Sequence, residues 1–400
     1  MTRLLKPFSR ITTSGRTFLP QIDGLRFVAI MAVIAYHVLA ITSFHYGVVQ
    51  ADFERSGNFI GELFGSGSLG VQLFFSISGF ILVLPFAKHH LKLGGSVKLR
   101  SYFIRRLTRL EPPYIIQLLM LFVLCCTLYR HTPSRPEFYH NTGWFTYTWQ
   151  HLTASLFYCN GFIFKTHPMP NIVLWSLEVE VQFYLLAPLL AQVFKLTNTG
   201  VRRAVITSLI FLVPIINHAS ISGYLSTCSL AGNLQYFLAG FLLCDLYLTR
   251  WSGDPARTWR WDFLFAAAVL SIVWHQHISY FIWLLPWLCL AMGMAAFRGI
   301  ATGWFLGNPW IATIGGMCYT IYMYHWLMIS ALMRATVNLH AHAYWLTLII
   351  QFLIMAPVIV AICAILFALF ERPFMQRDWP ARLWAVLSRQ KISSTIGQQG

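Results

Sequence analysis

The sequence alternates long apolar runs with short polar segments that carry most of the charged residues. Each run is long enough to cross the hydrocarbon core of a membrane as a helix. We count ten runs, at residues 22–42, 69–87, 112–130, 175–194, 203–219, 230–248, 262–279, 281–298, 314–334 and 345–370. Little separates the seventh run from the eighth beyond Gln276 and His277. The pattern predicts an all-α, polytopic membrane bundle of about ten transmembrane helices.

Composition supports a membrane protein. The chain is 57% hydrophobic and 10% charged, with a mean hydropathy of +0.60, whereas a soluble domain carries about 25% charged residues. No long polar segment remains once the apolar runs are removed, so we expect no separate soluble domain. We divide the chain into a basic cytoplasmic tail (1–20), one membrane domain (21–380) and a second cytoplasmic tail (381–400).

The net charge of +16 follows the expected membrane topology. If the N-terminus lies in the cytoplasm, nearly all Lys and Arg residues of the loops fall on the cytoplasmic side. This agrees with the excess of Lys and Arg that cytoplasmic loops of membrane proteins carry. Five fall on the other side: Arg55, Arg130, Arg135, Lys165 and Arg334. The basic charge therefore indicates orientation, together with contact to membrane lipids, and not a nucleic-acid partner.

The cysteines and histidines show no metal-ligand spacing. Eight cysteines are present without a CxxC pair, and most lie in apolar runs, where a free thiol behaves as a small hydrophobic group. We expect no metal site, no bound cofactor and no disulfide framework. A single bridge among Cys126, Cys159 and Cys228, which lie near the predicted outer face, remains open.

The first run, 21–42, carries two ionisable residues that a plain anchor does not need, Arg26 and His37. They are eleven residues apart, so a helix places them on nearly the same face, roughly 16 Å apart along the axis. An ionisable group deep in a membrane helix indicates a functional site. The structural alternative is an Asp23–Arg26 pair at the helix start, with His37 bonded to a neighbouring helix.

Polar residues in two other parts of the sequence also suggest chemistry. Before the third run, Arg106 and Arg109 share a helical face, and their planar guanidinium groups suit phosphate oxygens. The alternative for them is topology and lipid headgroups. In the fourth run, Glu178 and Glu180 lie just inside the membrane, with Ser176 one turn before Glu180 and Tyr184 one turn after it. A carboxylate there needs a partner or a use.

The second and ninth runs are less specific. GVQLFFSISGF contains small residues (Gly70, Ser76, Ser78 and Gly79) that favour close helix packing, with a substrate-lining role as the second interpretation. GGMCYTIYMYHWL places Tyr322 one turn before His325. A single histidine in such a position is more often structural than catalytic.

Taken together, these segments resemble the acyltransferase 3 family of integral membrane O-acyltransferases. The matching pieces, in order, are IDGLRFVAIMAVIAYHV (22–38), GVQLFFSISGFIL (70–82), FIRRLTRLEPPY (103–114), WSLEVEVQFYLLAPLL (175–190) and IGGMCYTIYMYHWL (314–327). The resemblance covers nearly the whole membrane part. Two residues depart from the pattern: Glu111 precedes Pro112, and Cys318 replaces a usual serine.

The resemblance assigns residues to roles. The Arg-x10-His pattern falls on Arg26 and His37, and the Arg-x-x-Arg pattern falls on Arg106 and Arg109. The WSLxxE pattern falls on Trp175, Ser176 and Glu180. The catalytic residues are then His37 and Glu180, with Glu180 orienting His37 and holding its charge. The residues assigned to substrate binding are Arg26, Arg106, Arg109, Trp175, Ser176, Tyr184 and His325.

The implied activity is transfer of an acyl group, usually acetyl, from acyl-CoA to a hydroxyl of a saccharide or glycolipid, such as lipopolysaccharide, another surface polysaccharide or peptidoglycan. His37 either acts as general base on that hydroxyl or itself carries the acyl group. The implied location is a bacterial inner membrane. The alternative function is a transporter of a glycolipid or small solute, but no internal repeat of the kind that many transporters contain is visible. A non-catalytic sensor is disfavoured, because it would need a soluble output domain and none is expected here.

The loop charges predict that both ends of the chain lie in the cytoplasm and that loop 131–174 lies outside. Reporter fusions at Arg389 and at Pro136 should therefore report opposite sides of the membrane. Both fusions reporting the same side would contradict the predicted spans.

Overall fold

The computed structural model describes residues 3–11, 18–54, 57–129, 144–221, 223–251, 256–376 and 379. Within these ranges every regular element is a helix and no strand forms. The predicted all-α membrane fold is therefore confirmed.

The structure divides the described chain into helices of very different lengths. The α-helices are α1 (Pro20–Tyr46), α2 (Gln50–Glu54), α3 (Phe59–Gly65), α4 (Gly70–His90), α5 (Leu99–Tyr129), α6 (Trp144–Leu156), α7 (Asn160–Phe164), α8 (Trp175–Leu190), α9 (Thr199–Ser220), α10 (Tyr224–Thr227), α11 (Leu230–Arg250), α12 (Trp259–Val273), α13 (Phe281–Arg298), α14 (Ala301–Gly307), α15 (Pro309–Gly316), α16 (Cys318–Thr336) and α17 (Tyr344–Leu366). Short helical turns join them: η1 (Arg3–Phe8), η2 (Ser66–Leu69), η4 (Ile172–Leu174), η5 (Ala191–Lys195), η6 (His275–His277), η7 (Phe367–Glu371) and η8 (Arg372–Met375).

Eight helical segments of the described chain are long and apolar enough to cross a membrane, so the protein is a multi-pass membrane protein. They are Pro20–Tyr46, Phe59–His90, Leu99–Thr127, Ile172–Lys195, Thr199–Ser220, Tyr224–Arg250, Phe281–Arg298 and Tyr344–Met375.

Two predicted runs have a different form. Run 262–279 becomes α12, of 15 residues, followed by the separate turn η6. Run 314–334 is divided at Met317 between the end of α15 and the start of α16. The segment 131–174, predicted to lie outside, falls partly beyond the described residues, and its described part forms the short helices α6 and α7 before η4. The tail 381–400 also lies outside them.

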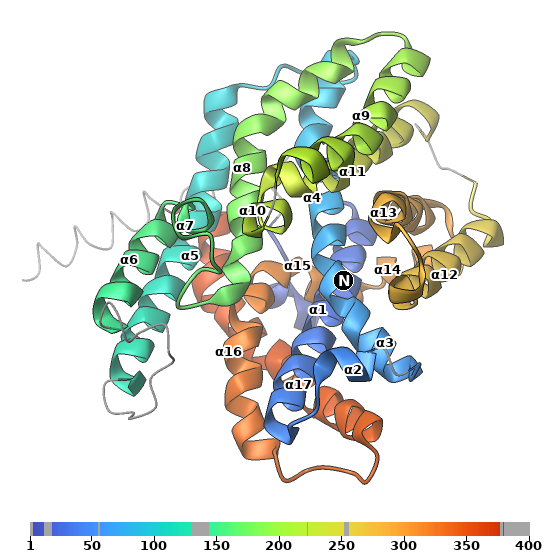
Figure 1. Ribbon diagram of the computed structural model, residues 1–400. Helices are drawn as coiled ribbons and strands as arrows, with labels where there is room; N and C mark the ends of the chain where they lie inside the picture. Colours follow the sequence, from blue (N-terminus) through green and yellow to red (C-terminus); the bar gives the residue numbers. More distant parts are fainter. Residues whose placement is uncertain are drawn as a thin grey trace, which may run out of the picture.

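Helix α1 lies at the centre of the bundle. It packs against α4, α13, α14, α15, α16 and α17, and Figure 1 shows these helices around it. The contact with α15 is so close that a Cβ on Gly315 would lie 1.7 Å from the carbonyl oxygen of Asp23. Glycine at position 315 therefore sets how near the start of α1 can approach α15.

Helices α4 and α11 run side by side and form another close contact (Figure 1). A Cβ on Gly79 would lie 2.2 Å from the Phe237 carbonyl oxygen, and one on Gly240 would lie 2.2 Å from the Ser76 carbonyl oxygen. Reciprocal glycines thus allow the two backbones to meet. For Gly79, the packing interpretation of the GVQLFFSISGF segment agrees with the structure.

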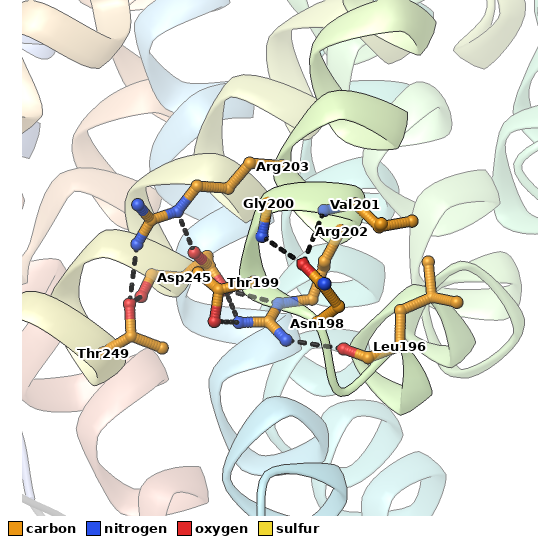
Figure 2. Close-up of polar contacts among 9 residues, drawn as sticks. All are labelled: Leu196, Asn198, Thr199, Gly200, Val201, Arg202, Arg203, Asp245 and Thr249. Carbon is orange, nitrogen blue, oxygen red and sulfur yellow. Dashed lines mark hydrogen bonds and ion pairs between the residues drawn. The ribbon is translucent and has the colours of Figure 1, made fainter.

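A buried ion cluster joins α9 to α11, and Figure 2 shows its hydrogen bonds. The Asp245 carboxylate accepts a hydrogen bond from Nε of Arg202 at 2.5 Å on one oxygen, and from Nε of Arg203 at 2.6 Å on the other. Arg202 and Asp245 are fully buried. Arg202 also donates to the Leu196 carbonyl oxygen at 2.6 Å, which holds the connection between η5 and α9.

Removing the charge of Asp245 should destabilise the protein. Asp245→Asn keeps the side-chain shape but leaves Arg202 buried without a counter-charge, which typically costs about 3–5 kcal/mol. We expect a lower melting temperature in thermal unfolding of the purified protein. Asp52→Asn, at an exposed position of α2, is the matched control. Equal melting of Asp245→Asn and the wild type would contradict a stabilising role for the cluster.

Candidate functional site

A cavity of about 100 Å³ lies between α1, α4, α5, α8 and α16. Such a volume holds several water molecules and is therefore large enough for a small acyl group. Six residues predicted from the sequence line it: Arg26, Arg106, Arg109, Ser176, Glu180 and Tyr184. They come from three separate runs of the sequence, so the fold brings together motifs that are far apart along the chain.

The cavity is rich in guanidinium groups. Arg26 and Arg10 both donate to the same Asp23 oxygen, at 2.5 and 2.8 Å, and Asp23 is only 4% exposed. Arg109 lies 3.9 Å from Glu371, a longer ion pair. The Arg106 guanidinium stands over the ring of Tyr184 at 5.8 Å.

Positive charge exceeds negative charge around this space. The guanidinium groups of Arg10, Arg26, Arg106 and Arg109 line the cavity, whereas Glu180 is the acidic residue among the lining residues that the structure describes. Asp23 and Glu371 lie next to the arginines, so the described groups sum to a net positive charge. In a low-dielectric environment this excess favours an anionic ligand.

Glu180 lines the cavity. Its carboxylate accepts a hydrogen bond from the Ser78 hydroxyl at 2.6 Å, and both residues line the cavity. For Ser78, the lining interpretation therefore fits better than packing alone. The expectation that Glu180 orients His37 stays a prediction.

Tyr322 connects the cavity to α8. The Ser176 hydroxyl donates to Oη of Tyr322 at 2.7 Å, and Oη of Tyr322 donates to the Val173 carbonyl oxygen at 2.9 Å. The Tyr322 ring lies 5.5 Å from the ring of His325, between centroids. Tyr322 thus contacts both the cavity and the histidine one turn farther along α16.

His37 and His325 form a pair at the far side of Tyr322. Their ring centroids are 5.0 Å apart, and Trp326 lies at the same distance from His37. Nδ1 of His325 lies 2.7 Å from the Tyr322 carbonyl oxygen. A nitrogen in that position carries a proton, so Nε2 of a neutral ring is the acceptor.

Two ring nitrogens in this pair are available to a ligand. Nε2 of His325 and Nδ1 of His37 are buried and make no hydrogen bond to any described residue. Buried polar atoms are normally satisfied, so a polar group that reached this pair would find two nitrogens able to bond to it. The structural alternative for His37, a bond to a neighbouring helix, is not met at Nδ1, whereas the Asp23–Arg26 pair does form.

The residues that line the cavity differ in part from those predicted from the sequence. Trp175 packs edge-on against Phe75, with centroids 6.3 Å apart, and does not line the cavity. Arg10, Tyr319 and Cys318 do line it. Tyr319 and Cys318 lie in a segment that the sequence analysis had singled out, but nothing in the pattern around Arg10 distinguishes it from the other basic residues of the tail.

The described part of the chain contains neither a group of metal ligands nor a disulfide bond. No group of three His, Cys, Asp or Glu side chains there is arranged to hold a metal ion. All eight cysteines are free thiols, including Cys126, Cys159 and Cys228.

Comparisons with known proteins identify relatives of this chain. A family model described as an acyltransferase domain, acyltransferase 3, matches residues 19–368. A Staphylococcus aureus (strain COL) protein with a provisional name as an O-acetyltransferase is 26% identical over 342 residues, which cover 78% of this chain and 51% of the relative. The chain thus spans about half the length of that relative. No solved structure matches the chain.

Two further relatives have more specific names. The peptidoglycan O-acetyltransferase OatA of Listeria monocytogenes is 31% identical over 195 residues, covering 46% of this chain and 26% of the relative. The O-acetyltransferase OatA of Staphylococcus aureus (strain NCTC 8325) is 28% identical over 179 residues, covering 43% of this chain and 24% of the relative.

Proposed function

Because this chain belongs to the acyltransferase 3 family of membrane proteins, we propose that it transfers an acetyl group from acetyl-CoA to a hydroxyl of a cell-surface or lipid-linked saccharide. The relatives named as O-acetyltransferases support the acetyl group and the hydroxyl acceptor. The loop charges support termini in the cytoplasm, and the bacterial relatives support a location in a bacterial inner membrane. A peptidoglycan or other polysaccharide acceptor follows from the relative's name.

The observation that carries this proposal is a cavity lined by arginines and by Tyr322, whose ring lies 5.5 Å from that of His325. Arg106 and Arg109 would hold the phosphates of coenzyme A, because planar guanidinium groups bind phosphate oxygens through paired hydrogen bonds. The thioester would then extend past Glu180 and Tyr322 toward His37. The excess of guanidinium groups over carboxylates supports an anionic donor.

His37 would act in one of two ways. As general base, it takes the proton of the acceptor hydroxyl while the hydroxyl oxygen attacks the thioester carbonyl. The carbon–sulfur bond breaks, and the proton passes to the leaving thiolate. As nucleophile, His37 first takes the acetyl group and releases the thiol, and the hydroxyl then attacks the acetyl-imidazole. Nε2 of His325 would accept the hydroxyl proton in the second route.

Lysine at Arg106 or Arg109 tests the donor site. The variants Arg106→Lys and Arg109→Lys keep the charge but lose the planar fork that matches phosphate. We expect weaker acetyl-CoA affinity with a smaller change in turnover, measured as KM and kcat of the purified protein. Arg100→Lys, at an exposed position at the start of α5, is the control. Unchanged donor affinity in both variants would contradict phosphate binding and would favour the alternative, in which these arginines only set the membrane topology.

Substitution of His37 tests the catalytic step. A general base typically contributes about 10²–10⁴-fold to the rate, so His37→Ala should insert into the membrane and lose nearly all transfer. His37→Gln, which forms hydrogen bonds but takes no proton near neutral pH, should be no better. His45→Gln, exposed in the last turn of the same helix, serves as the control.

A purely structural role for His37 predicts the reverse pattern. Glutamine would then restore packing and activity, and alanine would lower the amount of protein in the membrane. Membrane abundance and transfer rate are therefore measured for both variants. A His37→Gln protein with a near-normal rate would end the catalytic assignment.

A further inference from the structure

The N-terminal segment, residues 3–11, lies before the matched domain, which begins at residue 19, yet it packs onto the bundle. Leu5 in η1 is 3% exposed, and Leu5 and Phe8 line an apolar groove formed with α1, α15 and α17. The Ser9 carbonyl oxygen accepts a hydrogen bond from Nε of Arg372 at 3.4 Å. These contacts involve the residues directly before Arg10, and they hold the segment against the bundle.

Arg10 extends from this segment into the charged cavity. Its side chain lines the cavity with Arg26, Arg106 and Arg109. A Cβ on Gly316 would lie 3.1 Å from both Cγ and Cδ of Arg10, so the lack of a side chain at Gly316 leaves the space that the Arg10 stem occupies. The segment and the α15–α16 junction therefore fit together around this one side chain.

The hydrogen bonds of Arg10 leave most of its donors free. Of the five N–H groups of a guanidinium, one donates to Asp23, at 2.8 Å, and the others have no partner among the described residues. Asp23 already has a closer partner, because Arg26 donates to the same oxygen at 2.5 Å. Arg26 can therefore stay paired with Asp23 while the remaining N–H groups of Arg10 bind an anion in the cavity.

We propose that Arg10 binds a phosphate group of the donor together with Arg106 and Arg109, so that a segment outside the matched domain completes the donor site. The ligand class is an organic phosphate that carries a thioester or thiol, and the inference rests on the proposed coenzyme A donor. A phosphate monoester carries a charge of about −1.5 to −2 at neutral pH, which three guanidinium groups match better than two.

The test is coenzyme A binding to the full-length protein in lipid nanodiscs, for the wild type, Arg10→Gln and Arg10→Lys. A charge-assisted hydrogen bond contributes about 1.5–3 kcal/mol, so Arg10→Gln should weaken the Kd for coenzyme A at least about tenfold. Arg10→Lys should be intermediate, because it keeps the charge without the fork. Arg100→Gln, which removes the same charge at an exposed site, should bind like the wild type.

A structural role for Arg10 would give a different pattern. Pantetheine lacks the phosphates of coenzyme A, so its affinity, measured by competition, should be the same in Arg10→Gln and the wild type. Loss of the Arg10–Asp23 pair can lower the melting temperature without ligand, but a phosphate-binding Arg10 still predicts a loss of affinity that is confined to coenzyme A. Equal weakening toward coenzyme A and pantetheine, with a lower melting temperature, would reduce Arg10 to an anchor of the segment and overturn the proposal.

The remaining outcomes separate this inference from the proposed function. Wild-type protein that binds coenzyme A, with Arg10→Gln binding it equally well, would overturn the role of Arg10 and leave the donor intact. Wild-type protein that does not bind coenzyme A would overturn the donor assignment, and the role of Arg10 with it.

Discussion

The site depends on one buried carboxylate, Asp23, in the first turn of the central helix. A buried charge is stable only when it is paired, and here two guanidinium groups, from Arg10 and Arg26, share one of its oxygens. The same turn is where α15 makes its closest approach, because Gly315 faces the Asp23 carbonyl oxygen. This arrangement places the N-terminal segment, α1 and α15 together and brings two arginines to the cavity.

Helix α16 carries both side chains that line the cavity and the histidine that contacts His37. Tyr319 and Tyr322 line the cavity, and His325 follows Tyr322 at the next three-residue step, so the three side chains follow one face of the helix. His325 then contacts His37 on α1. The break at Met317 starts α16 in a new direction after α15 and lets this face meet both α1 and α8.

Sequence reasoning worked best where a physical signal is local. Hydrophobic length located the membrane helices, and a polar residue in an apolar run marked Arg26, Glu180 and Ser176, which line the cavity. It did less well on segments that tertiary packing interrupts: run 314–334 contains a break at Met317, and α12 is short for a span. Local length and composition do not encode these interruptions.

Contacts between distant segments were the least accessible to prediction. The spacing of Arg26 and His37 is correct for one continuous helix, but spacing alone does not show that Tyr322 and His325 stand between His37 and the cavity. The hydrogen bond from Ser78 to Glu180 likewise depends on how α4 packs against α8, which the local sequence does not show. Arg10 carries no signal beyond its charge, because only the docking of residues 3–11 brings it into the site.

The most direct test of the account is acetyl transfer in membrane vesicles of known orientation. Isotopically labelled acetyl-CoA does not cross a membrane unaided, so only inside-out vesicles present it to the cytoplasmic face where the arginines are proposed to bind it. Inside-out vesicles that contain the protein should form a base-labile, labelled acetyl ester on a glycan, and right-side-out vesicles should not. Labelling that is absent from inside-out vesicles, or equal in both orientations, would contradict a cytoplasmic coenzyme A site that supplies a saccharide acceptor.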